Sequence, residues 1–359
     1  MARTKAECPQ ALRARLARAL WIARERRPRP RVLGVGIALM LLCGVPRAES
    51  TEEPAAGEPG GVGLAIVTRK ALMAVYGGAA TLDEAVVLVK DGRIEDVGSR
   101  QTLAIPAGYE ALDLGALWLA PGMIDLHNHT AASIMDLNDM VFLTNPELRA
   151  SAGVTPNNPL QAKGVAGGVT SVLLIPGSGT NMGGQGILLK TAGESFEDIV
   201  VRNPGSLKLA QAGNPERWAI NPGRSFMNWN TRNTFQRGLA YARRWEEYET
   251  QGGERPERDV QFEIFRELLS KRCQVSAHTQ VFQVVLMTIT MVRRELGLDV
   301  FIDHGEFEGM LLGGLAQEAG VPAIIGPREV DMPSGRTRTD GKFLGIAAGY
   351  QERGHEMVG

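Results

Sequence analysis

Four of the five histidines in this 359-residue chain lie where a short apolar run meets a polar or glycine-rich loop: His127, His129, His278 and His304. Because successive side chains of a strand point to opposite faces, the His-x-His spacing puts His127 and His129 on one side. Two polar residues on the exposed face of a strand would show the same spacing. The pair follows residues 119–125, however, and this run is too apolar for an exposed strand edge. Two imidazoles so placed can share one cation, and imidazole is a common ligand of zinc and related ions.

His278 and His304 each follow a predicted helix and then a short apolar run. Each is therefore expected at the carboxyl end of a parallel strand, where the active sites of barrel enzymes are built. A single histidine in such a place is more often a hydrogen-bonded core residue than a metal ligand. Three separate strand ends that carry histidine are harder to attribute to packing, so the sequence predicts one metal site assembled from several strand ends.

The elements that must position these histidines change in character at Pro121. Between residues 63 and 119, short β-branched runs and the turn Lys90-Asp-Gly-Arg93 predict a small antiparallel sheet with a hairpin. Beyond Pro121, short apolar runs alternate with longer helical segments, as in a parallel sheet with crossover helices. The predicted strands are residues 123–126, 170–175, 186–189, 206–209, 274–277, 300–302 and 322–325, and the predicted helices are residues 235–249, 261–272, 282–296 and 310–319.

Seven such strands predict an α/β fold, a TIM-type (β/α)8 barrel that is incomplete at its eighth strand, because only residues 356–359 remain to begin that strand. The predicted domains are this barrel over residues 121–359 and a small β-sheet portion over residues 63–120. With 44% hydrophobic residues, the chain has enough material for one large domain and a smaller one.

The first 31 residues are strongly basic, with nine Arg and one Lys against two Glu, a net +8. Since the whole chain has a net charge of -1, residues 32–359 carry about -9, which does not support a nucleic-acid surface on the body. The apolar run 32–46 has the length of a signal-peptide core and is short for a membrane span. We expect residues 1–50 to be a leader, residues 51–62 a linker, and the protein to be exported to the periplasm or secreted. An uncleaved anchor is the alternative.

Two segments carry a family resemblance: Ala85-Val-Val-Leu-Val-Lys-Asp-Gly-Arg-Ile94 and Leu119-Ala-Pro-Gly-Met-Ile-Asp-Leu-His-Asn-His129. They resemble the entry to a barrel of the amidohydrolase superfamily, in its imidazolonepropionase-like or dipeptidase-like branch. The resemblance covers residues 63–359 and implies a β-sandwich, built from both chain ends, beside the barrel. Residues 63–120 would form the N-terminal half of that composite sandwich.

The resemblance assigns ligand roles position by position. His127 and His129 match the first-strand pair, and His278 and His304 match the ligands of the fifth and sixth strands. Lys208 falls on the fourth strand and is the candidate carboxylated lysine, although a solvated lysine would read the same way and Lys190 is a rival. With a carboxylated lysine two cations fit side by side, and without it one is expected.

In such a site, zinc, or else iron, manganese or nickel, lowers the pKa of a bound water, and the resulting hydroxide attacks a C–N bond. The family's catalytic Asp lies on the eighth strand. No Asp follows Asp340 here, so the resemblance places that residue beyond Gly359. The predicted function is hydrolysis of a small amide, cyclic amide or dipeptide, with deamination as a close variant. The alternatives are an inactive truncated fragment and one half of a split enzyme.

Other residues are less informative. Asn181 and Gln185, in the glycine-rich run 176–186, are candidate substrate contacts on a mobile loop, or else part of a long turn. Residues 226–230 line a pocket or simply pack. We expect Cys273 to be a packed small hydrophobe and His355 to lie on the surface. The expected partners are a small molecule or dipeptide, no nucleic acid, the membrane only through the leader, and either a second copy or a complementing C-terminal chain.

Overall fold

The computed structural model describes residues 62–75, 78–211, 215–217, 221–327, 330–331 and 344–356. The chain divides into two compact units, Met1–Pro121 and Gly122–Gly359. The predicted leader (1–50) and nearly all of the predicted linker (51–62) lie outside the described residues. In the part of the chain that is described, no helix combines the length and apolar character needed to cross a membrane.

The first unit is a mixed five-stranded sheet rather than the purely antiparallel sheet predicted. Its strands are β1 Gly63–Val75, β2 Gly78–Lys90, β3 Arg93–Ser99, β4 Tyr109–Asp113 and β5 Trp118–Leu119. β1, β2 and β3 pair antiparallel, whereas β4 and β5 return beside β1 in parallel. The predicted hairpin turn is confirmed, because Lys90 pairs with Arg93 and both central residues, Asp91 and Gly92, have positive φ.

The second unit contains one seven-stranded sheet whose strands neighbour one another in chain order. Each predicted strand has its counterpart in this sheet, and the α/β architecture is confirmed. The strands are β6 Met123–Asn128, β7 Val169–Leu174, β8 Met182–Lys190, β9 Val200–Ala210, β10 Gln274–Thr279, β11 Val300–His304 and β12 Ala323–Ile325. Two further short strands, β13 Val330–Asp331 and β14 Leu344–Gly345, pair only with each other among the described residues.

The prediction that all seven strands run parallel is wrong for β8, which is antiparallel to both neighbours. Only residues 175–181 connect β7 to β8, and a parallel crossover needs a dozen or more residues. The glycine-rich run predicted as a mobile loop is therefore divided: residues 176–181 belong to the connection, and residues 182–186 belong to β8. Its glycines permit close backbone approach: a Cβ at Gly184 would lie 2.6 Å from the Leu148 carbonyl oxygen, and one at Gly186 would lie 2.7 Å from that of Leu174.

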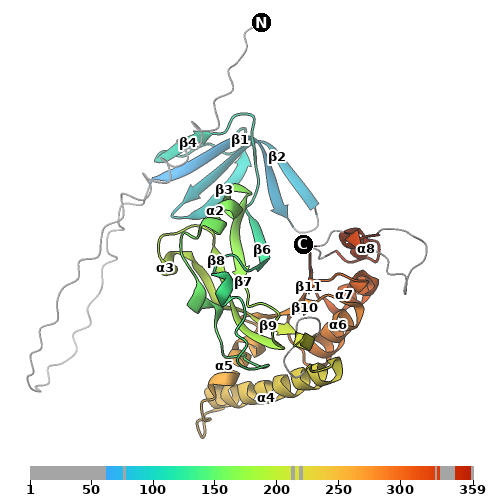
Figure 1. Cartoon of the computed structure of the whole chain (residues 1–359). Helices are drawn as coiled ribbons and strands as arrows, with labels where there is room; N and C mark the ends of the chain where they lie inside the picture. The colour runs from blue at the N-terminus through green and yellow to red at the C-terminus, as the bar shows by residue number, and fades with distance from the viewer. Residues whose placement is uncertain are drawn as a thin grey trace, which may run out of the picture. The chain divides into compact units, whose positions relative to one another are not determined.

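Helices cover the outer face of β9, β10 and β11 (Figure 1). The α-helices are α2 Pro159–Ala166, α3 Phe196–Ile199, α4 Arg224–Gln251, α5 Glu263–Leu269, α6 Phe282–Met287, α7 Gly313–Ala319 and α8 Ile346–Gln351, and Thr288–Glu295 continues α6 as a π-helix. Short 3-10 turns lie at Ile134–Asp136, Ala150–Gly153, Pro215–Arg217, Val260–Phe262 and Gly309–Leu312. The four predicted helices are confirmed.

Strand alternation determines which side chains face the barrel interior. Leu207 and Leu209 of β9, with Val275 and Ile302 of the next strands, belong to the apolar core under the helices. Phe301 instead clusters with Leu173 of β7 and with Ile175, the residue that follows β7. Residues that alternate with the outward set, which include Lys208, His278 and Asp303, therefore point inward.

Cys273 is buried as predicted, and burial raises the pKa of its thiol to about 12. The prediction of a surface position for His355 is wrong. Its ring is 1% exposed, and its Nε2 donates to the Val321 carbonyl oxygen at 2.9 Å. The residue packs edge-on against Tyr350 of α8 and therefore belongs to the core.

The contact between α4 and α5 depends on a small residue. A Cβ at Gly238 would lie 2.3 Å from the ring of Phe265, which is fully buried. We expect Gly238→Ala to destabilise the protein by about 1–3 kcal/mol through overpacking, measured by denaturant unfolding. Gly164→Ala in α2 is the control, because its nearest neighbour would lie 3.8 Å away, and it should be neutral or slightly stabilising. Equal effects of the two substitutions would contradict this packing account.

Candidate metal centre

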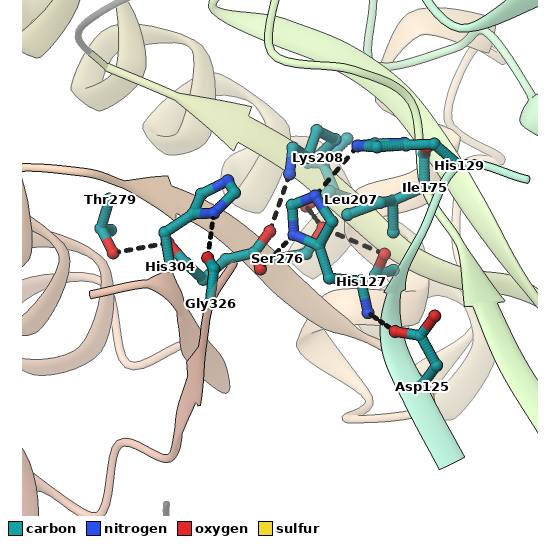
Figure 2. Close-up of polar contacts among 12 residues, drawn as sticks. Asp125, His127, His129, Ile175, Leu207, Lys208, Ser276, Thr279, His304 and Gly326 are labelled. Carbon is teal, nitrogen blue, oxygen red and sulfur yellow. Dashed lines mark hydrogen bonds and ion pairs between the residues drawn. The ribbon is translucent and has the colours of Figure 1, made fainter. Parts of the chain in front are cut away.

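The four strand-end histidines form one row of neighbouring rings, and Figure 2 shows three of them, His127, His129 and His304. Ring centroids are 4.7 Å apart for His129 and His127, 4.5 Å for His127 and His304, and 4.6 Å for His304 and His278. The rings come from β6, β10 and β11, whose carboxyl ends meet at one end of the sheet. The four predicted imidazole ligands thus follow one another in a single row, ring beside ring.

Three of the imidazoles are anchored through Nδ1. His129 donates to the Ile175 carbonyl oxygen at 2.9 Å, and His304 donates to that of Gly326 at 2.6 Å. His127 Nδ1 contacts the carboxylate of Asp303. Because each acceptor takes a proton from Nδ1, the neutral form of each ring presents an unprotonated Nε2, which is the form that binds metals.

The Nε2 atoms of His127 and His129 face each other at 3.0 Å. In the tautomers fixed by Ile175 and Asp303, this contact brings two lone pairs together. A cation bound by both nitrogens removes the repulsion. With a Zn–N distance of about 2.0–2.1 Å, tetrahedral ligand nitrogens lie about 3.3 Å apart, close to the separation found here.

His278 is the most direct sign that the cluster is built for a ligand. Its ring is 4% exposed, and neither nitrogen has a hydrogen-bond partner among the described residues. A buried imidazole without partners costs free energy, so such a group calls for a functional explanation. A metal ion bound by His278 and its neighbours would supply that explanation, and the donor set is compatible with a divalent transition metal.

Lys208, the candidate fifth ligand, points into the same interior. It is 1% exposed and donates from Nζ to Asp303 Oδ2 at 2.8 Å. Lys190, the rival lysine, is exposed at the end of β8 and pairs in register with Ser171, on the neighbouring strand β7. The structure therefore brings Lys208 to the cluster and leaves Lys190 outside it.

Asp303 is the residue of the site that the sequence reasoning missed. It is fully buried, and its carboxylate contacts both His127 and Lys208. Ligand atoms of His127, Asp303 and His304 lie within 4.8 Å of one another. The sequence of β11 contained the information needed to find Asp303. Successive side chains of a strand point to opposite faces, so Asp303 faces inward if Ile302 faces outward.

Burial controls the protonation of the cluster. Desolvation, followed by electrostatic repulsion from the neighbouring His127 and Lys208, lowers the pKa of His129 to about 4. Desolvation and Lys208 lower the pKa of His278 to about 2, and desolvation also lowers that of His304. Burial alone would raise the pKa of Asp303, but Lys208 and His127 more than offset it and hold the pKa below its usual value. At neutral pH His129, His278 and His304 are therefore neutral and available as ligands.

The two candidate substrate contacts are held by the protein itself. Asn181 is fully buried: its amide nitrogen donates to the Ala210 carbonyl oxygen at 2.8 Å, and its amide oxygen accepts from Asn230 at 2.7 Å. Gln185 donates to the Pro146 carbonyl oxygen at 3.0 Å. A substrate contact by either side chain stays a prediction, and it would require these hydrogen bonds to be exchanged.

The segment 226–230 lies in α4 and is partly packed, and its role as a pocket lining stays a prediction. Asn230 packs into the Asn181 network, whereas Phe226 and Trp229 stay exposed and stack on each other with centroids 5.7 Å apart.

Comparisons with known proteins agree with this architecture. The amidohydrolase tasK of Hapsidospora irregularis is 32% identical over 114 residues, 30% of this chain. The imidazolonepropionase of Pseudomonas syringae pv. tomato is 34% identical over 55 residues, 15% of this chain. These segments span only 12% and 14% of the two relatives.

A crystal structure of an amidohydrolase from Thermotoga maritima is similar over a much longer stretch. It matches 82% of this chain and 77% of its own, with a TM-score of 0.67 and 26% identity. No family model matches the chain. The sequence relatives and this structural match support the assignment to the amidohydrolase superfamily that the motifs predicted.

The lowered histidine pKa values predict how the metal-free protein responds to acid. Below about pH 6.5 the unfolded chain protonates His129 and His278 while the folded chain does not, so stability falls as pH falls. Between pH 6.5 and 4 each of these groups contributes a slope of up to about 1.4 kcal/mol per pH unit. Urea unfolding of the metal-free protein across this range measures the slope. His278→Gln should flatten it, and an unchanged slope would contradict the burial of an ionisable His278.

Proposed function

We propose that the chain is a metal-dependent hydrolase of C–N bonds whose metal is held by His127, His129, His278 and His304. The observation that carries the proposal is the gathering of imidazole nitrogens: the Nε2 atoms of His127 and His129 lie 3.0 Å apart, and the buried ring of His278 has no hydrogen-bond partner among the described residues. A divalent metal bound there would supply Lewis-acid activation of a water molecule and of a substrate carbonyl oxygen.

The chain's own residues have separate tasks in this proposal. The backbone carbonyls of Ile175 and Gly326 hold the rings of His129 and His304 in the ligand tautomer. Burial keeps His278 neutral, so that one ring nitrogen keeps its lone pair free of a proton. Lys208 forms a buried ion pair with Asp303 and so places a positive charge in the interior. To act as a carboxylated ligand, Lys208 would have to give up this ion pair.

The substrate class rests on the relatives. The amidohydrolases and the imidazolonepropionase named above support hydrolysis of an amide or cyclic amide, and a dipeptide fits the same chemistry. Deamination is the nearest variant, because an amidine carbon accepts the same attack. A non-catalytic protein that only binds metal, or one half of a split enzyme, is the alternative from another class.

The finer parts of the proposal concern assembly and location. We propose zinc as the metal, in one or two copies, and the sheet of residues 63–120 as half of a composite β-sandwich. The basic head followed by the apolar run 32–46 supports export to the periplasm or beyond. A second copy of the chain, or a complementing C-terminal chain, is proposed as the protein partner.

Alanine substitution tests the shared site. His127→Ala and His278→Ala each remove one ligand, so each should lower zinc affinity by at least tenfold and abolish hydrolysis of N-acyl amino acid and dipeptide substrates. Chelator competition measures the affinity. His355→Gln is the matched control, because this buried histidine hydrogen-bonds Val321 away from the cluster and should leave zinc binding unchanged. Variants that bind zinc as tightly as the parent would refute the shared site, and a zinc-loaded parent without activity would favour the non-catalytic alternative.

A further inference from the structure

We propose that Asp303 is a positioning residue with two simultaneous tasks: it holds the imidazole of His127 in the ligand orientation, and it is the counter-charge of Lys208. This inference rests on the proposed metal site and deepens it. Its starting point is the division of one carboxylate between two partners, with Oδ1 on His127 Nδ1 and Oδ2 accepting from Lys208 Nζ at 2.8 Å.

The location of the carboxylate makes both contacts rigid. The side chain of Asp303 has no exposed surface, and that of Lys208 is 1% exposed. The backbone around Asp303 is fixed as well, since its carbonyl oxygen accepts from the Thr279 hydroxyl at 2.9 Å and β11 pairs with β10 in register. A side chain held in this way can define the orientation of the ring that it contacts.

The anchor of His127 differs from those of its neighbours. His129 and His304 donate from Nδ1 to neutral backbone carbonyls, whereas His127 donates to an ionised carboxylate. A carboxylate fixes the tautomer and also raises the basicity of the opposite nitrogen, so it strengthens His127 as a ligand. With both oxygens already engaged by donors, Asp303 acts on the metal through His127 rather than as a ligand itself.

The second task follows from burial. An ammonium group out of contact with water is strongly unfavourable unless an opposite charge accompanies it. Removal of one member of such a pair leaves an uncompensated charge, whereas removal of both is far less damaging. Lys208 and Asp303 should therefore be coupled energetically in the metal-free protein.

A double-mutant cycle on the metal-free full chain tests the counter-charge task. Asp303→Asn and Lys208→Met should each lower the melting temperature by about 10 °C. The double variant should melt closer to the parent than either single variant, because no buried charge is left unpaired. Additive losses would overturn this half of the proposal.

Cobalt binding tests the positioning task, with Co²⁺ as the probe and a chromophoric chelator as competitor. Adding Asp303→Asn to Lys208→Met should weaken Co²⁺ binding by about 10- to 100-fold, even though it raises the melting temperature. The visible spectrum at saturation should keep its shape, because the ligands are unchanged. A purely structural role predicts that affinity recovers together with stability, and that result, or equal affinities of the two variants, would overturn the proposal. A changed spectrum would make Asp303 a ligand and would overturn it too.

Asp125→Asn is the matched control. Asp125 also contacts His127, but it accepts from the backbone amide at 3.0 Å rather than from the ring, so its loss should leave Co²⁺ affinity nearly unchanged. A parent that binds Co²⁺ but cleaves no C–N substrate would refute the proposed activity and leave these comparisons readable. A parent that binds no metal would refute the shared site and, with it, the positioning task. The double-mutant cycle of melting temperatures would still test whether Asp303 is the counter-charge of Lys208.

Discussion

The buried carboxylate of Asp303 joins three strands of the barrel. Asp303 lies on β11, its lysine partner on β9 and its histidine partner on β6. β6 and β11 are not neighbours in the sheet, since four strands separate them in the pairing order. The contact between Asp303 and His127 therefore spans the interior and fixes the distance across the sheet at the height of the histidine cluster.

This arrangement places several demands on the rest of the fold. Desolvation of Lys208 and Asp303 costs free energy of folding. Burial of the apolar residues around the ion pair must offset this cost. The layer under the helices does so through residues such as Leu207, Val275 and Ile302, which alternate with the polar interior set. Each of the strands β9, β10 and β11 thus has two functions: its outward residues pack against the helices, and its inward residues form the site. The same alternation leaves His278 buried with both nitrogens free of protein partners among the described residues.

Much of this arrangement was predictable from the sequence, because its determinants are local. Each histidine ends an apolar run, and the runs themselves become the strands of the sheet. The direction of β8 was missed because the pattern of apolar residues does not encode direction; the seven-residue connection after β7 does. Asp303 could not be recognised from its immediate neighbours, because its partners His127 and Lys208 lie on distant strands; only the outward position of Ile302 indicates that Asp303 faces inward. The burial of His355 depends on its contact with Tyr350, which no local pattern contains.

X-ray absorption at the zinc edge of the zinc-loaded full chain tests most directly whether the four imidazoles share a metal. A metal held by these imidazoles predicts a first shell of nitrogen and oxygen at about 2.0–2.1 Å, with the multiple scattering of several imidazole rings. His278→Ala should reduce that imidazole contribution. A first shell of oxygen alone, or an imidazole signal that His278→Ala leaves unchanged, would contradict a metal centre at this cluster.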